Sequence, residues 1–384
     1  MAVSRNFLSK PISSYYLLIG STAALTGLGL VMVLSASSVH SLEIGGSSFA
    51  IMLRQLFFLT VAIPLGFVAS RLPIARWRTV ARFSLIGSAT ILIMTQVPGL
   101  GHTVNGNQNW LGMGSIVIQP SEFAKFFMIL WAGHILSKQD RAGAAKKNVI
   151  AMLVPAFVAI MGLVLLGGDL GSTAVIAAIL VGLLFVSGIP LRFIGITSVV
   201  GLSAVGVMIV SVPYRMRRLL VVLHPFSPVY YKLTGWQPAH SIMGLASGGF
   251  FGVGLGASRQ KWGNLAEAHT DFIFSVLGEE LGLLGTLAVL LLFSALIFSI
   301  FRIAIRADDP MTRYICAGIG CWIAVQAIMN IGSASSVLPV VGVTLPLLSY
   351  GGSSLISTFL ALGFVLGAAR RDPSIVQAAR RARQ

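Results

Sequence analysis

Ten long apolar runs constrain this chain more than any other feature of its sequence. Each is near or above the roughly 20 residues that an α-helix needs to cross a bilayer. The runs lie at about 14–37, 50–70, 79–98, 120–137, 148–166, 171–188, 192–212, 272–302, 314–335 and 350–369. They predict an all-α integral membrane protein with ten transmembrane helices, organised as one domain over residues 1–384.

The composition excludes a soluble domain. Hydrophobic residues make up 56% of the 384 residues and charged residues only 10%, whereas an ordinary globular protein carries about 25% charged residues. The net charge of +16 would suggest a nucleic-acid partner in a soluble protein. In a membrane protein it is better interpreted as a bias of basic loops toward the cytoplasm, with anionic lipid headgroups as neighbours.

The basic residues predict the orientation of the chain. The odd-numbered connections, around 38–49, 99–119, 167–170 and 336–349, contain no Lys or Arg. The N-terminus, the even-numbered connections and the tail at 370–384 are basic, through Arg5, Lys10, Arg71, Arg76, Arg78, Arg82, Lys138, Arg141, Lys146, Lys147, Arg192, Arg302, Arg306, Arg313, Arg370, Arg371, Arg380, Arg381 and Arg383. Both termini are therefore predicted to be cytoplasmic, and the tail is a basic cytoplasmic segment.

The segment 213–271, between the seventh and eighth runs, breaks this pattern. By parity it is a large extracytoplasmic loop, although it holds Arg215, Arg217, Arg218, Lys232, Arg259 and Lys261. Long loops escape the charge rule, so the predicted topology stands. The cations could simply contact headgroups, or the RMRR sequence could form an interfacial helix that binds phosphate. The glycine-rich run 244–256 is interpreted as a re-entrant or interfacial element.

Seven of the eleven acidic residues fall outside the predicted cytoplasmic side. Glu122 and Lys125 have the spacing of a helical ion pair, which could either neutralise itself or bind substrate. Asp169 lies in a glycine-flanked turn, where it could cap the next helix. Glu43 lies in a polar loop and is interpreted as solvated.

Asp271 is the strongest candidate for catalysis. It lies where the basic loop meets the eighth run, where it could cap that helix through backbone N–H groups, and Glu267 and His269 come just before it. A helix N-terminus there would favour the carboxylate, while apolar walls would raise its pKa, and such opposed influences tune a carboxylate to act as a base. Glu279 and Glu280 lie about 12 to 13 Å further along the same helix, so they are not expected to share a reacting atom with Asp271.

Several motifs resemble the SEDS family of integral-membrane peptidoglycan polymerases. They are VNGNQNW at 104–110, IQPSEFAKF at 118–126, GDLGSTA at 168–174, GWQPAHSIMGLASGGFFGVGLG at 235–256, AEAHTDFIFSVLGEELG at 266–282 and LPVVGVTLPLLSYGGSS at 338–354. The ASRQK and GEELG sequences resemble the division branch of the family more than the elongation branch.

The resemblance implies a reaction. SEDS proteins polymerise lipid II into β-1,4 glycan strands at the outer face of the cytoplasmic membrane and release undecaprenyl diphosphate. It implies that Asp271 is the essential acidic residue of the family. Its carboxylate would act as a general base and take a proton from the acceptor sugar. It also implies a class B penicillin-binding protein, a transpeptidase, and other division proteins as partners.

The resemblance also extends to residues that bind substrate. Positive charge for the diphosphate could come from Lys125, Arg215, Arg217, Arg218 and Lys261. Further candidates in the matching motifs are Glu122, Asp169, Gln237, Ser241, Glu267 and His269. A divalent cation, Mg or Mn, could assist with Glu122 or Asp169 as ligand, and no organic cofactor is expected.

The sequence departs from the family pattern at three places. Ala266 stands where proline is usual, Gln108 and Asn109 precede Trp110 in a loop where family members often place arginine after Asn-Gly, and Gly167-Gly168 stand where the family has Gln-Pro before Asp169. If that arginine holds diphosphate in other members, another cation must do so here.

A lipid II flippase, or another transporter of polyprenyl lipids, is the alternative function. Transporters also carry intramembrane acids and broken helices. The distribution of charge favours the polymerase, because a flippase needs polar groups along a path through the membrane. Here the candidates gather near one face, and His134 in the cytoplasmic half is interpreted as an interfacial residue.

Overall fold

The computed structural model describes residues 10–43, 46–104, 107–113, 116–143, 146–210, 213–232 and 234–381. Ten long helices overlap the ten predicted runs one for one. They are α1 (Ile12–Glu43), α2 (Ala50–Arg71), α3 (Ile74–Met94), α4 (Pro120–Arg141), α5 (Lys146–Leu166), α6 (Leu170–Val186), α7 (Leu191–Val210), α11 (Ile273–Arg306), α12 (Pro310–Ala334) and α13 (Gly352–Arg371).

Six of these helices, α1, α2, α5, α11, α12 and α13, are long and apolar enough to cross a membrane by length and composition. The helix α6 and the first part of α7 are apolar but shorter. The helices α3 and α4 carry more charged residues, among them Arg76, Arg78 and Arg82 in α3. The chain is therefore a multi-pass membrane protein.

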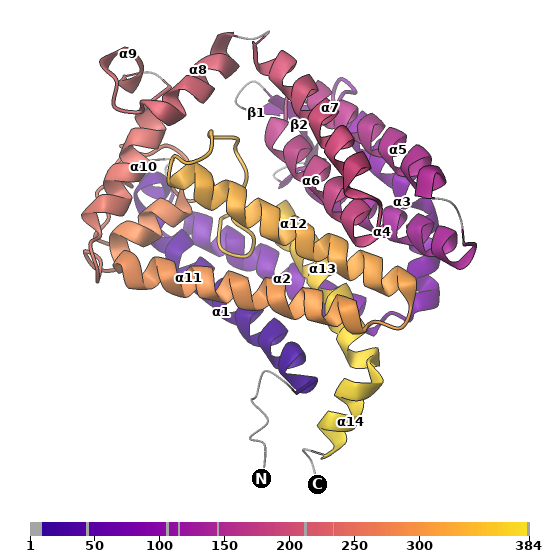
Figure 1. The fold of residues 1–384 in the computed structure, drawn as a ribbon. Helices are drawn as coiled ribbons and strands as arrows, with labels where there is room; N and C mark the ends of the chain where they lie inside the picture. Colours follow the sequence, from indigo (N-terminus) through magenta and orange to yellow (C-terminus); the bar gives the residue numbers. More distant parts are fainter. Residues whose placement is uncertain are drawn as a thin grey trace.

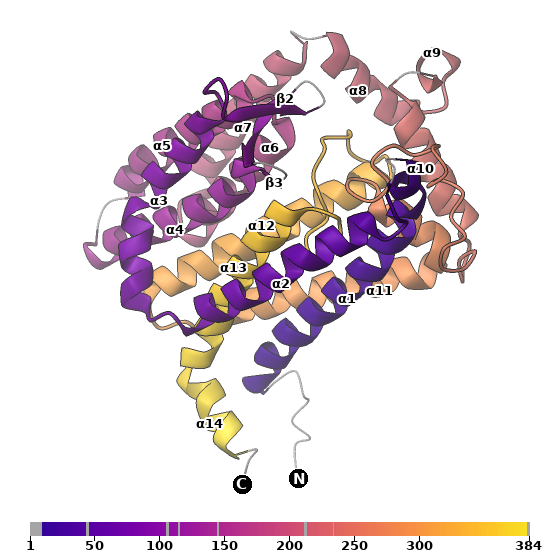
Figure 2. The ribbon, with the colours of Figure 1, turned by 180° about the vertical axis from the view of Figure 1, so that it is seen from behind.

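The helices pack around α12, which lies against α11 on one side and against α4 and α6 on the other (Figure 1). The helix α1 runs along α11, and α2 runs along α13. The helices α2 and α13 approach closely at two glycines, because a Cβ atom at Gly363 would collide with the carbonyl oxygen of Gly66. The start of α1 and the end of α13 lie at one end of the molecule, and residues 213–232 and the connection between α3 and α4 lie at the opposite end (Figures 1 and 2).

The connection between α3 and α4 forms a small antiparallel sheet, which the all-α prediction did not include. It contains β1 (Gly101–Val104), β2 (Asn107–Met113) and β3 (Ile116–Ile118) in the order β1-β2-β3. Its middle strand packs on the turn between α5 and α6, where Asn107 and Asn109 approach Gly168 and Gly167. The Asn105-Gly106 pair of the sequence is typical of a two-residue hairpin turn and was the signal for this element.

The segment 213–271 contains three shorter helices and a series of turns. These helices are α8 (Pro213–Leu223), α9 (Pro228–Tyr231) and α10 (Trp236–Ser247). The glycine-rich run comes after α10 in the sequence and lies in space against α11, at the point where that helix is kinked at Gly282 (φ 65°, ψ −162°). There Val253 N–H donates to Glu279 O at 3.0 Å, and Leu283 N–H donates to Gly249 O at 2.9 Å. The backbone groups freed by the kink are thus bonded to the predicted re-entrant run, consistent with the rule that irregular backbone at membrane depth must be covered.

The last described element is α14 (Pro373–Arg381), which follows α13 directly and lies within the predicted basic tail. It packs against α1 and α13.

Candidate active site

Asp271 lies two residues before the start of α11 and keeps part of its surface exposed. Within the described residues its carboxylate makes no hydrogen bond and no ion pair, and the expectation that it caps α11 is wrong: Phe272 is the N-cap residue, and α11 has no side-chain cap. The reason is a tight turn, closed by Phe272 N–H donating to Glu267 O, which places Asp271 ahead of the first helical turn.

The surroundings of Asp271 favour its protonated form. Burial raises the pKa of Asp271 to about 7, the negative charges of Glu267 and Asp169 act in the same direction, and Arg218 opposes them. Gly342 lies close by, since a Cβ atom there would be 3.6 Å from Asp271 Oδ2. The side chain therefore meets the main requirement of a general base, which is a pKa near the working pH.

Glu267 and His269 come just before Asp271, and no hydrogen bond among the described residues joins either side chain to its carboxylate. Glu267 adopts a left-handed conformation (φ 56°) and accepts a hydrogen bond from Thr270 Oγ1 at 2.8 Å. The His269 ring lies 5.5 Å from the His40 ring and 5.6 Å from the Tyr350 ring, centroid to centroid. Burial lowers the pKa of His269, Glu267 opposes this, and His40 lowers it further. At neutral pH His269 is a neutral ring, so it adds no positive charge beside Asp271.

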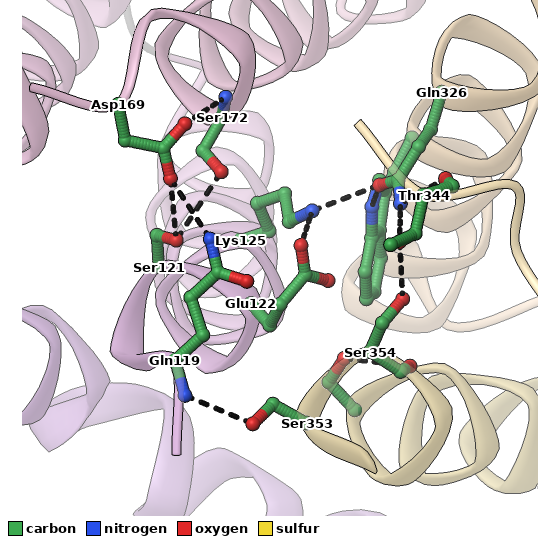
Figure 3. Close-up of polar contacts among 12 residues, drawn as sticks. Gln119, Ser121, Glu122, Lys125, Asp169, Ser172, Gln326, Thr344, Ser353 and Ser354 are labelled. Carbon is green, nitrogen blue, oxygen red and sulfur yellow. Dashed lines mark hydrogen bonds and ion pairs between the residues drawn. The ribbon is translucent and has the colours of Figure 1, made fainter. Parts of the chain in front are cut away.

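Glu122 and Lys125 form the predicted ion pair (Figure 3). The Lys125 side chain is fully buried, and its Nζ lies 2.7 Å from Glu122 Oε1 and 2.8 Å from Gln326 Oε1 on α12. Gln326 in turn accepts a hydrogen bond from Trp322 and donates one to Thr344 O. The pair thus neutralises itself and joins α4 to α12 and to the segment that follows α12.

Asp169 caps α6, as the turn sequence suggested. Its Oδ1 accepts from Ser172 N–H at 2.8 Å, and its Oδ2 accepts from Gln119 Nε2 and Ser121 Oγ (Figure 3). Both oxygens of this buried carboxylate are therefore occupied.

Glu122 and Asp169 do not fit a divalent cation. Such an ion needs several oxygen ligands, and here both Asp169 oxygens accept hydrogen bonds and Glu122 Oε1 is held by Lys125, which leaves Glu122 Oε2 as the one oxygen of the two carboxylates without a partner among the described residues. The described residues also contain no group of three or more His, Cys, Asp or Glu side chains that could hold a metal ion. No step of the reaction is assigned to a metal here.

A cavity of about 360 Å³ lies between α8, α10 and the segment after α12. Its polar lining consists of Arg217, Arg218, Thr234, Gln237 and Ser336. The hydroxyl oxygens of Thr234 and Ser336 are buried and have no hydrogen-bond partner among the described residues. Two cations and two unpaired hydroxyl groups are the lining that a phosphorylated ligand requires.

Asp271 does not itself line the cavity, but the wall segment that contains Val340 continues to it. Arg218 Nη1 donates to Val340 O at 3.3 Å, and two residues later in the same segment Gly342 faces the carboxylate. Arg218 is also the cation that lowers the pKa of Asp271. The side chain of Arg215 lies outside the described part of the chain.

Two predicted substrate ligands have structural roles instead. Lys261 is buried, donates to Gly256 O at 2.5 Å and lies 3.8 Å from Glu280 Oε1, so its charge is neutralised internally. Ser241 is fully buried and donates to Ala334 O at 2.6 Å. Neither side chain is available to a ligand in this structure.

The two adjacent acids of α11 anchor the loop that leads to the site. Glu279 accepts hydrogen bonds from Ser258 Oγ, Arg259 N–H and Gln260 N–H. Glu280 accepts from Ser35 Oγ on α1 at 2.6 Å and from Ser258 N–H at 3.3 Å. Buried carboxylates that accept this many hydrogen bonds hold the structure together, so Glu279 and Glu280 fix the loop 258–260 to α11 and α1 in this structure.

The comparisons with known proteins agree with the resemblance noted in the sequence. The model of the cell cycle protein family that comprises FtsW, RodA and SpoVE matches residues 16–373. The chain belongs to this family. A probable peptidoglycan glycosyltransferase FtsW of Mycobacterium tuberculosis is 38% identical over 378 residues, which are 98% of this chain and 72% of the relative.

Two solved structures show that the family resemblance extends to the fold. A chain of a peptidoglycan synthase complex, described as coordinating polymerization and crosslinking, aligns with a TM-score of 0.76 at 28% identity and covers 93% of this chain and 98% of its own length. The rod shape determining protein RodA of Thermus thermophilus aligns with a TM-score of 0.68 at 28% identity, over 93% and 96% of the two chains.

Sequence reasoning missed several polar residues of this FtsW/RodA/SpoVE family member. Gln326 and Asn330 lie one helical turn apart on α12, and Thr344 and Ser349 follow in the next segment; all four make hydrogen bonds around the site. The signal was present in the sequence, because two amides four residues apart in an apolar span face the same side of the helix.

Proposed function

We propose that this protein is a peptidoglycan glycosyltransferase that polymerises lipid II into β-1,4 glycan strands during cell division and releases undecaprenyl diphosphate. The observation that carries the proposal is the side chain of Asp271, which has a pKa of about 7 and lies beside the segment that continues from the wall of a cavity lined by Arg217 and Arg218. Membership of the FtsW/RodA/SpoVE family and the likeness to a peptidoglycan glycosyltransferase support the reaction class.

The proposed chemical step is a single displacement. The Asp271 carboxylate takes the proton of the acceptor sugar's 4-hydroxyl group while that oxygen bonds to the anomeric carbon of the donor. The bond from this carbon to the diphosphate oxygen breaks, and the diphosphate leaves with the electron pair. One displacement inverts the α-linked donor to a β-linkage, so it needs one base and no covalent intermediate.

Arg217 and Arg218 stabilise the leaving group in this proposal. The departing diphosphate gains negative charge as the bond breaks, and guanidinium groups and hydroxyl donors at the cavity wall can bind its oxygens. Gln237, Thr234 and Ser336 supply the uncharged donors. Lys125 and Lys261 are left out of this role because each is engaged internally.

All ten long helices are proposed to cross the cytoplasmic membrane, with both termini and the tail 370–384 in the cytoplasm. The whole chain then forms one transmembrane domain, and 213–271 is its large extracytoplasmic loop. The start of α1 and the end of α13 lie at the end of the molecule opposite to α8 and the strands, which supports this orientation (Figures 1 and 2). Asp271 would act at the outer leaflet.

A class B penicillin-binding protein is the proposed partner, together with other division proteins. The structural likeness to a chain of a synthase complex described as coordinating polymerization and crosslinking supports a transpeptidase at its side. The new glycan strands would then reach the crosslinking enzyme directly.

The test is polymerisation of purified lipid II by the purified protein in detergent or liposomes, alone and with its transpeptidase partner. We expect glycan strands from the wild-type protein and none from Asp271→Asn, with unchanged folding. Parallel reactions with Mg²⁺, with Mn²⁺ and with a chelator measure any need for a cation. Transbilayer movement of labelled lipid II without polymer would identify a flippase and would overturn the proposal.

A further inference from the structure

We propose that Asn330, Ser349 and Gln55 are positioning residues that hold the general base through its backbone. The inference rests on the proposed role of Asp271, and it concerns how that side chain is aimed. None of the three residues contacts the Asp271 carboxylate. They act on the peptide groups that precede and carry it.

The observation is that three consecutive carbonyl oxygens are each held by a donor from elsewhere in the chain. Tyr350 N–H donates to His269 O at 2.9 Å, and Ser349 Oγ donates to Thr270 O at 2.6 Å. Asn330 Nδ2 donates to Asp271 O at 2.8 Å. The segment that enters α11 is therefore fixed by residues that lie 59 or more positions further along the sequence.

Asn330 joins the base segment to the segment after α12. Its Nδ2 also donates to Val343 O at 2.7 Å, so both amide hydrogens are used. The side chain is 2% exposed, and its orientation follows from chemistry, because a reversed amide would place its oxygen against two carbonyl oxygens. By holding residues 271 and 343 together, Asn330 keeps Gly342 beside the Asp271 carboxylate.

Ser349 is held in turn from two directions. Its hydroxyl accepts from Leu345 N–H at 2.8 Å while it donates to Thr270 O. Gln55 of α2, which is 2% exposed, donates to Ser349 O at 3.3 Å and accepts from Gly351 N–H at 3.2 Å. The turn that positions the base is thus bonded to a helix from the opposite end of the sequence.

This arrangement separates two requirements of a base. A direct hydrogen bond to the carboxylate would stabilise its charged form and lower its pKa. Fixing the backbone instead restricts where the side chain lies and leaves its oxygens free for the substrate hydroxyl group. Accurate placement matters because a misplacement of about 1 Å can cost roughly 10²-fold in rate.

The experiment compares Ser349→Ala with a matched control, Ser275→Ala. Ser275 is also buried, and its hydroxyl donates to Ser241 O at 2.6 Å, the same length as the bond from Ser349 to Thr270 O. Each variant loses one hydrogen bond between distant segments, but Ser349→Ala also leaves Leu345 N–H without its acceptor, so a somewhat larger loss of thermal stability is expected for Ser349→Ala than for Ser275→Ala. Asn330→Ala is the second variant, and it removes two bonds.

For Ser349→Ala we expect kcat for lipid II polymerisation to fall about tenfold or more, with KM within about twofold of the wild-type value. Asn330→Ala should lower kcat further. The acid limb of the pH profile should move to lower pH in both, because a loosened segment lets water reach the carboxylate and burial is what raises its pKa. Ser275→Ala should leave kcat and the pH profile unchanged.

Two results would overturn the inference. One is a Ser349→Ala enzyme whose kcat and acid limb equal those of Ser275→Ala, which would leave Ser349 a purely structural residue. The other is a raised KM at unchanged kcat, which would indicate a role in binding. Either result, with Asp271→Asn inactive, rejects the positioning role alone, whereas an active Asp271→Asn enzyme rejects the proposed base itself.

Discussion

Asp309 and Asp271 both precede long helices of this protein, and the structure uses them in opposite ways. Asp309 is the N-cap residue of α12, where it accepts from Thr312 N–H and lies 2.7 Å from Arg78 and 2.9 Å from Arg141. Burial alone would raise the pKa of Asp309, but the hydrogen bonds from Thr312 and Arg78 outweigh it and lower the pKa. Asp271 has no such partners among the described residues, and its pKa is about 7.

The comparison shows how a structural carboxylate at a helix start differs from the carboxylate that is proposed to act as a base. Every partner of Asp309 favours its charged form, so its charge contributes to stability and joins α3, α4 and α12. Asp271 keeps its charge near neutral pH at a cost in stability, and that cost is what makes it ready to accept a proton.

The largest expected effect comes from exchanging each aspartate for its amide. Asp271→Asn should lower polymerisation by on the order of 10²- to 10⁴-fold, because the base is removed. Its melting temperature should be equal to or above that of the wild-type protein, since the penalised charge is gone. Thermal unfolding in detergent and a gel assay for glycan strands measure both. A clear loss of stability would show that the charge of Asp271, like that of Asp309, stabilises the folded protein.

The pH dependence sharpens the same contrast. Asp271 must be deprotonated to act, so kcat/KM should rise with pH and level off above about 7. Below that value it should fall about tenfold per pH unit, as expected for one essential base. The measurement is the initial rate of lipid II polymerisation at low substrate between pH 5 and 9. An acid limb near pH 4, the ordinary range of an aspartate, would contradict the environment described here.

The arginines of the cavity should affect binding, and one of them should also affect the base. Arg217→Gln and Arg218→Gln should each raise the KM for lipid II by roughly five- to tenfold, as expected for a lost charge-assisted hydrogen bond. Only Arg218→Gln should also move the acid limb to higher pH, because Arg218 lowers the pKa of Asp271. An unchanged KM in both variants would leave these residues as contacts to lipid headgroups.

Asp309 should affect stability instead of chemistry. Asp309→Ala removes a helix cap, worth about 0.5–2 kcal/mol, and two partly exposed ion pairs, each worth roughly 0.2–1 kcal/mol. Asp309→Asn keeps the helix cap and should lose only the stability that the two ion pairs contribute. Because the pKa of Asp309 is lowered in the folded protein, its contribution is present above the pKa of the unfolded chain and disappears as the pH falls through the folded value. Melting temperatures at pH 7 and pH 3 measure this, and equal values for all three proteins would contradict it.

The smallest expected effect concerns Glu267. Its negative charge raises the pKa of Asp271, so Glu267→Gln should move the acid limb to lower pH by less than about one unit. The maximum rate above that limb should change little. A shift to higher pH would mean that Glu267 stabilises the carboxylate through a contact made only with substrate present.

The sequence allowed the helices to be predicted because each buries an apolar run, and no tertiary information was needed for that. The sheet at 101–118 was missed because its strands are short and lie between much longer apolar runs, although the Asn105-Gly106 pair offered a local signal. The roles of Lys261 and Ser241 could not be predicted, since a sequence does not show that Glu280 or Ala334 O lies opposite. The local contacts of Glu122, Lys125 and Asp169 were easier to predict, because one partner of each lies three residues away in the sequence.

Asp271 was located correctly beside the basic loop, but its geometry was not. The sequence suggested a helix cap, which would have lowered the pKa, and the turn from Glu267 to Phe272 prevents it. The donors that fix this turn come from α12 and from residues 349–350, which are distant in sequence. Such long-range hydrogen bonds leave no local pattern.

The glycine contact between α2 and α13 has a genetic consequence. Any side chain at Gly66 or Gly363 would wedge these helices apart, since a Cβ atom would meet the backbone of Phe359 or of Gly66. The helix α2 carries Gln55, and the turn at residues 349–351 leads directly into α13. In a random mutagenesis screen for growth, inactivating alleles should therefore appear at this seam, remote from any bound sugar, even where the protein still accumulates normally in the cell envelope.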